Sequence, residues 1–228
     1  MSIRTDLALE SINAAKISEG ITKTERGKAF KITEINIAED KHGEKIGKKK
    51  GKYITLEGSV FSCFSKDFRE MCEEFSEELS QFVPDGKVLV VGLGNNDITP
   101  DALGPQTASK ILATRHLKEE LKDEDEFLTS LRPVGVLASG VLGQTGIETA
   151  ELIDGLMEKI DPQAIIAVDA LACSDINRLG KTIQLSDTGI SPEAKEESMI
   201  LGYAEGKNLS LILSSDYIKL LDDYTKNM

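Results

Sequence analysis

Apolar and polar residues alternate in two stretches near the start of the chain, which predicts two β-strands. The stretches are "AFKITEINIAED", residues 29–40, and "KYITLEGSV", residues 52–60, and both are rich in β-branched and aromatic residues. The apolar positions of the first change parity between Ile32 and Ile35, which predicts a bulge or a register change there. The basic, glycine-punctuated segment that joins the two strands is predicted to be a loop.

Apolar residues then recur at every third or fourth position, which predicts a helix over residues 65–82. Ser65 is a suitable N-cap for this helix, and Pro84 and Gly86 end it. Together with the two strands, the helix forms an N-terminal β-rich extension over residues 1–84.

From Lys87 the pattern becomes an alternation of strands and helices. Continuous apolar runs, typical of strands buried on both faces of a parallel sheet, alternate with segments of helical period. The order predicts an α/β fold, a three-layer α/β/α sandwich with a mostly parallel sheet, as the core of the protein over residues 85–192. The predicted elements are a strand at 87–93, a helix at 104–121, a strand at 133–138, a helix at 146–160, a strand at 164–168 and a short strand at 181–185.

Composition and charge narrow the class of protein. The chain has 228 residues, 40% of them apolar, which is enough for one sizeable α/β core. A net charge of −12 argues against binding to nucleic acids or anionic membranes. No apolar run reaches the roughly 20 residues that span a bilayer. Three cysteines without a CxxC spacing indicate reduced thiols and a cytoplasmic location.

The stretch "VLVVGLGNNDITPDALGP", residues 88–105, joins the first core strand to a glycine-rich turn. A dinucleotide cradle has the pattern G-x-G-x-x-G, with an acidic residue about 20 positions further on. Gly92 and Gly94 match, but Asp97 stands at the third glycine position and would repel a pyrophosphate. The acid that would bind a ribose is missing around Thr114. No nucleotide cofactor is therefore expected.

Two aspartates stand at the ends of core strands. Asp101 follows the first strand, and Asp169 ends the third. If the strands lie in the order second, first, third, then the first and third are neighbours about 4.8 Å apart. Right-handed crossovers then bring both acids to the crevice in which open α/β sheets bind ligands. The alternative is that each aspartate only caps the helix after its strand.

A carboxylate pair of this kind is suited to the hydrolysis of a peptide bond. Because two nearby carboxylates repel, one can hold a proton while the other stays ionised. The ionised one takes a proton from the attacking water, and the protonated one polarises the carbonyl. We therefore interpret Asp101 and Asp169 as catalytic, with Gly92, Gly94 and Asn95 leaving room for the substrate backbone.

Other candidate sites are weaker. The triplet Asp-Thr-Gly at 187–189 is also found in aspartyl proteases, but those enzymes are all-β and pair two copies, so a turn explains this one. His42 and His116 have no partner at i+3 or i+4, so no metal is expected. Cys173 has no identifiable histidine base and is interpreted as a small apolar residue.

Six blocks, in this order, resemble the spore germination protease family. They are "RTDLALE", "VVGLGN…TPDALGP", "ATRHL", "GVLGQTGIET", "AVDALA" and "IQLSDTGISP", and they cover about residues 3–192. The resemblance implies an endopeptidase that initiates degradation of small acid-soluble spore proteins during germination, with a core similar to the hydrogenase-maturation peptidases. It also implies that Asp101 and Asp169, in the "PDALGP" and "DALA" blocks, are the catalytic pair.

The resemblance further implies a homotetramer, synthesis as a zymogen, a location in the forespore and spore core, and no established metal. Two departures from the family pattern stand out. Only Met1, Ser2 and Ile3 precede the first block, which points to numbering close to a mature form or to altered zymogen control. After Pro192 the tail, residues 193–228, diverges; within it "LSLIL" is predicted to be a replacement strand and "DYIKLLDDYTKNM" a short helix.

Two alternatives stay open on the sequence. One is a truncated, non-catalytic relative that folds or oligomerises without hydrolysing peptides. The other is a metal-dependent maturation-type peptidase, in which Asp101, Asp169 and a distant histidine hold the ion. Incubation with a spore protein tests the first, and a chelator tests the second.

Overall fold

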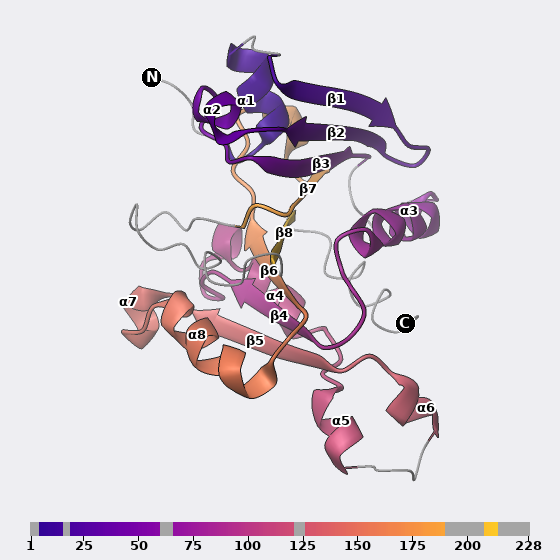
Figure 1. Cartoon of the computed structure of the whole chain (residues 1–228), viewed down its shortest axis with the longest axis vertical. Helices are drawn as coiled ribbons and strands as arrows, with labels where there is room; N and C mark the ends of the chain where they lie inside the picture. The colour runs from indigo at the N-terminus through magenta and orange to yellow at the C-terminus, as the bar shows by residue number, and fades with distance from the viewer. Residues whose placement is uncertain (1–4, 16–18, 60–65, 121–125, 190–207, 214–228) are drawn as a thin grey trace.

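One mixed sheet of eight described strands organises the molecule, in the order β1-β2-β3-β7-β8-β6-β4-β5 (Figure 1). This computed structural model describes residues 5–15, 19–59, 66–120, 126–189 and 208–213. The antiparallel part consists of β1 (Ile21–Arg26), β2 (Lys31–Ile37), β3 (Gly51–Glu57) and β7 (Thr182–Ser186). The parallel part consists of β8 (Asn208–Leu213), β6 (Ala164–Ala170), β4 (Val88–Leu93) and β5 (Val134–Gly140).

Two helices pack against the parallel strands. The short helix α4 (Leu103–Ala108) packs on β4, β5 and β6, and α8 (Thr149–Ile160) packs against β5. No helix within the described ranges is long and apolar enough to cross a membrane. The other helical segments are α1 (Ala8–Ala15), α2 (Asp40–Glu44), α3 (Phe68–Ser80), α5 (Arg115–Glu120), α6 (Glu126–Ser130), α7 (Leu142–Thr145) and the 3-10 turns η1 (Thr99–Asp101) and η2 (Ile176–Arg178).

The continuous apolar runs are buried on both sides, as the sequence predicts for parallel strands. Val88 and Val90 of β4 belong to the core cluster that includes Phe75 of α3. Leu89 and Val91, one position further along, belong to the opposite cluster, which includes residues of α8. An α/β fold with parallel core strands is therefore confirmed.

The predicted bulge in the first strand is wrong. β2 pairs with β3 in continuous register along its whole length. The change of parity has another cause, because both faces of β2 are covered. Ile32 packs into the cluster beneath α3, whereas Ile35 and Ile37 pack on the other face against Ala8 and Leu9 of α1. The segment between β2 and β3, predicted to be a loop, also contains the short helix α2.

Two short helices, α4 and α5, stand where a single helix is predicted from residue 104 onward. The break lies where Thr114 binds the start of β5. The Thr114 amide donates to the Val134 carbonyl at 3.0 Å, and the Val134 amide donates to Thr114 Oγ1 at 2.9 Å. These bonds to β5 take the place of helical ones, so tertiary pairing overrides the local helical period.

The helix predicted from residue 146 begins at Thr149 as α8. Its N-terminus is closed by a capping box, in which Glu148 and Glu151 each bond to the other's backbone amide. Ile147, inside the predicted range, therefore precedes the helix and is 43% exposed. The preceding residues form the separate turn of helix α7.

The remaining predictions concern α3, the C-terminal segment and the division of the chain. The helix predicted at 65–82 is confirmed as α3, although its N-cap position is Asp67 and Ser65 lies outside the described residues. The replacement strand "LSLIL" is confirmed as β8, which lies inside the sheet between β7 and β6. The helix predicted from "DYIKLLDDYTKNM" lies outside the described residues. The division at residues 84 and 192 stays a prediction.

Candidate active site

The three core strands lie in the order second, first, third, as β5-β4-β6, which is the order required to bring the two aspartates to one edge. β4 and β6 are parallel neighbours, and Gly92 pairs with Val168. Asp169 therefore follows directly on a residue paired with the end of β4. Since the carboxyl ends of parallel strands meet at the same edge, the loops after β4, β5 and β6 share one rim of the sheet.

Asp101 ends the 3-10 turn η1, eight residues beyond the end of β4. Its Oδ2 accepts a hydrogen bond from the Asn95 amide at 2.6 Å, which closes the loop between the strand and the turn. It does not cap the following helix, because the N-cap residue of α4 is Ala102 and no side chain caps that helix. Asp101 is partly buried.

Asp169 is the second-last residue of β6 and is also partly buried. Its Oδ1 accepts a hydrogen bond from the Ala170 amide at 2.8 Å, and it makes further interactions besides. The next helical turn, η2, is capped by Asp175. The alternative that each aspartate only caps a following helix is therefore wrong for both residues.

Glycines bring the Asp101 turn against the end of β6. A Cβ on Gly104 would lie 2.5 Å from the Val168 carbonyl oxygen, and a Cβ on Gly92 would lie 2.1 Å from the Gly104 oxygen. A Cβ on Gly94, at φ +110°, would lie 2.1 Å from the Asp101 oxygen. The turn η1 is accordingly in contact with β6.

The sequence predicted that Gly92 and Gly94 leave room for the substrate backbone, and this prediction is wrong. The space beside each glycine is occupied by the protein's own backbone.

The segment after β5 joins the same rim. Gln144 of α7 donates from Nε2 to Asn95 Oδ1 at 2.9 Å and to Asp97 Oδ2 at 3.1 Å. Asn95 Oδ1 also accepts from the Asp97 amide at 2.9 Å. Asn95 thus links the loops of two strands and the Asp101 carboxylate, a role that the sequence did not indicate for Asn95 or for Gln144.

The N-terminal segment holds the loop that follows Asp169. The Asp6 amide donates to the Ala172 carbonyl and the Ala172 amide donates to Asp6 Oδ2, both at 2.9 Å. Glu10 Oε2 accepts from the Ser174 amide at 2.8 Å and from Ser174 Oγ at 2.6 Å. Glu10 Oε1 lies 3.2 Å from Arg178 Nε in an ion pair. Sequence reasoning missed this contact, although both acids belong to the quoted block "RTDLALE".

Glu10 → Gln should destabilise the protein most at neutral pH. Burial acts to raise the pKa of Glu10, but hydrogen bonds from Ser174, from Thr5 and from backbone amides outweigh it and lower the pKa. A pKa below that of the unfolded chain gives stability that is complete above the unfolded-state value and is lost as pH falls through the folded-state value. Loss of these hydrogen bonds should lower the free energy of unfolding by about 1–2 kcal/mol, which corresponds to about 2–8 °C in Tm.

The measurement is Tm against pH for both proteins. The difference between wild type and variant should narrow below about pH 4, where glutamate protonates. Glu70→Gln, on the exposed side of α3, is the matched control and should leave Tm unchanged at every pH. A difference in Tm between wild type and Glu10→Gln that stays constant down to low pH would contradict the role given to the Glu10 charge.

A family model described as germination protease matches residues 4–197 of the sequence. The chain belongs to the germination protease family. The family resemblance predicted from the six sequence blocks is thereby confirmed.

Curated germination proteases from three bacteria illustrate the extent of the similarity. The relative from Clostridium acetobutylicum is 42% identical over 205 residues, which cover 84% of this chain and 62% of the relative. The relative from Caldanaerobacter subterraneus is 43% identical over 84% of this chain and 61% of its own length. The relative from Priestia megaterium is 41% identical over 84% of this chain and 56% of its own length. The chain therefore spans about three fifths of the length of these germination proteases.

The weaker candidates of the sequence are placed elsewhere or in structural roles. Asp187 Oδ1 accepts from the Lys52 amide at 2.8 Å, and the Asp187 amide donates to the Lys52 carbonyl at 3.3 Å, which fixes the turn after β7 to β3. Gly189 has φ +78°, as a turn requires. The turn interpretation of the triplet 187–189 agrees with these contacts.

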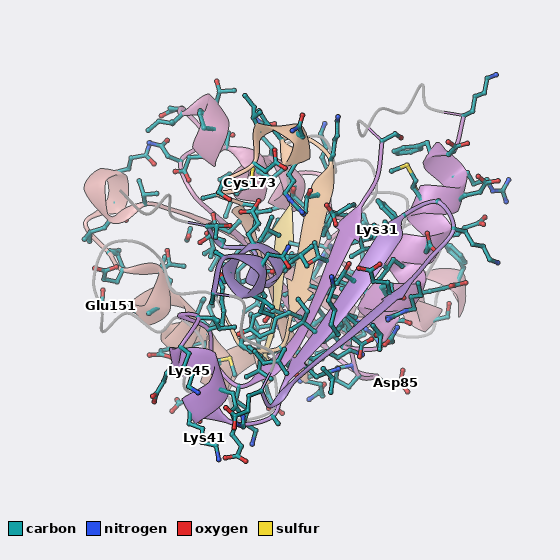
Figure 2. The ribbon with its side chains drawn as sticks, turned by 90° about the horizontal axis from the view of Figure 1, so that it is seen from above. Lys31, Lys41, Lys45, Asp85, Glu151 and Cys173 are labelled. Carbon is teal, nitrogen blue, oxygen red and sulfur yellow. The ribbon has the colours of Figure 1, made fainter. Side chains whose placement is uncertain are left out.

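Cys173 lies in the loop after β6. Burial and the nearby Glu10 carboxylate raise the pKa of its thiol, which disfavours the thiolate that a nucleophile needs. In Figure 2, Cys173 lies well apart from Lys41 and Lys45 of the basic segment around α2. Among the residues described, no group of three or more His, Cys, Asp or Glu side chains is arranged to hold a metal ion.

Proposed function

We propose that this chain is an endopeptidase that initiates the degradation of small acid-soluble spore proteins during germination. The observation that carries the proposal is that Asp101 lies in the turn after β4 and Asp169 lies at the carboxyl end of the neighbouring parallel strand β6. Membership of the germination protease family supports the class of substrate. The curated relatives carry that name as well.

In the proposed reaction the two carboxylates share the work of activating water. Each is held by a backbone amide, that of Asn95 for Asp101 and that of Ala170 for Asp169. One carboxylate, ionised, takes a proton from the water as it attacks the peptide carbonyl. The other, protonated, donates a hydrogen bond to the carbonyl oxygen, on which negative charge develops. Proton return to the departing amine completes hydrolysis.

We further propose that the core is a three-layer α/β/α sandwich like that of the hydrogenase-maturation peptidases. The packing of α4 and α8 with opposite apolar clusters supports this arrangement. A homotetramer, a location in the forespore and spore core, and synthesis as a zymogen are proposed on the family relationship alone.

Incubation of the purified chain with a small acid-soluble spore protein tests the proposal. We expect defined fragments, resolved by mass spectrometry, at the same rate with and without a strong chelator. An intact substrate would instead indicate a non-catalytic relative. Cleavage that stops on chelation and returns with added metal would indicate a metal-dependent maturation-type peptidase.

A further inference from the structure

The two edges of the sheet differ in how they are protected. Edge strands offer unpaired backbone groups to other chains, and proteins usually blunt them with charges or proline. On the β1 edge, Lys23 and Glu25 form an ion pair at 3.0 Å. The other edge strand, β5, has the sequence VGVLASG, with neither a charged residue nor a proline in seven positions (Figure 1).

The outward backbone groups of β5 can be identified from its bonds. The Pro133 carbonyl accepts from Val88 and therefore points toward β4. The Val134 amide and carbonyl bond to Thr114 and therefore point away from β4. Since successive residues of a strand direct these groups to opposite sides, the groups of Val136 and Ala138 also point outward. No described residue forms a hydrogen bond with them, and Ala138 is exposed.

This edge, which no described strand pairs, leads directly to the candidate active site. β5 ends at Gly140, and Gln144 of the following α7 bonds to Asn95 and Asp97 in the rim that contains Asp101. Large apolar side chains are exposed at the same end: Ile98 at 50%, Leu142 at 42% and Ile147 at 43%. The groups left unpaired are N–H and C=O alternating at peptide spacing, and their natural partner is an extended polypeptide.

We propose that the substrate polypeptide docks as an added strand on the outer edge of β5, with its apolar side chains against Ile98, Leu142 and Ile147. The added strand passes from β5 over the rim to the two aspartates. This inference rests on the proposed endopeptidase function and deepens it, because it names the surface that recognises the substrate backbone.

Ala138→Pro tests the docking edge, because proline removes the outward N–H and leaves the β4–β5 bonds intact. With a small acid-soluble spore protein as substrate, we expect KM to rise roughly fivefold for one lost hydrogen bond, with kcat unchanged. Ala138→Ser keeps the N–H, so its KM should lie closer to the wild-type value than the KM of Ala138→Pro does. Thermal unfolding and molar mass in solution are measured for each protein.

Each outcome bears on the inference. An unchanged KM in folded Ala138→Pro, with active wild type, overturns the docking edge and leaves the proposed function standing. A changed molar mass in that variant means that a second copy occupies β5, which also overturns it. If wild type cleaves nothing, the proposed function fails. The dissociation constants of the same spore protein for wild type and variant then still test whether the β5 edge binds it.

A second measurement does not need the proline variant to fold. Substrate peptides N-methylated at single positions are offered to wild type. Methylation should weaken binding at every second position along the docked segment, because alternate N–H groups of an added strand face β5. Equal effects at all positions would overturn the inference.

Discussion

Asp169→Asn is expected to lower the rate of spore-protein cleavage by about 10² to 10⁴, with Tm nearly unchanged. Asparagine has the shape of aspartate and still accepts from the Ala170 amide, but it can neither take nor give up a proton. Asp101→Asn should have an effect of similar size, since asparagine can keep the bond from the Asn95 amide. Asp154→Asn, an exposed residue of α8, is the matched control and should leave the rate unchanged.

The double variant is the sharper test of a pair. If the two carboxylates act as a unit, removing either one already destroys the mechanism, so the double variant should be hardly slower than the slower single variant. Two losses that multiply would mean that the residues act independently, and retained cleavage in both single variants would remove the assignment. Rates are measured under single-turnover conditions, so that binding and chemistry are separated.

The core strands could be predicted from sequence because their burial leaves a strong pattern. Strands covered on both faces must be apolar throughout, and the runs that contain Val90 and Ile166 could be read directly. Burial on both faces also explains the wrong prediction for β2. Ile32 and Ile35 face two different apolar clusters, and the resulting change of parity resembles the pattern of a bulge. Burial on both faces therefore makes a strand easy to predict from sequence, but its apolar pattern does not indicate whether the strand contains a bulge.

The parts that could not be predicted depend on partners far away in sequence. Thr114 interrupts a helical period because it bonds to Val134, 20 residues later. Asp6 and Glu10 hold the loop after Asp169 across more than 160 residues. The positions of both aspartates followed from strand ends alone, whereas Asn95 and Gln144 needed the folded loops to bring them together.

Gly104→Ala is expected to lower the free energy of unfolding by roughly 2–4 kcal/mol, which corresponds to about 4–16 °C in Tm. The added Cβ would lie 2.2 Å from the Leu93 oxygen, 2.5 Å from the Leu93 nitrogen and 2.5 Å from the Val168 oxygen. These atoms are backbone atoms of two buried, hydrogen-bonded strands, so no side chain can move aside to relieve the clash. The helix α4 must lift from the sheet, and the Asp101 turn at its start must move with it.

Gly155→Ala separates this clash from the general effect of replacing glycine. Gly155 lies inside α8, and a Cβ there would meet nothing within 4 Å. Alanine in a helix interior is favoured over glycine by up to about 1 kcal/mol, so this variant should be more stable than wild type. The same substitution is thus expected to have opposite signs at two positions. If Gly104→Ala instead leaves Tm unchanged, then α4 does not rest directly on the backbone of β4 and β6, and the proposed pairing of Asp101 with Asp169 loses its structural support.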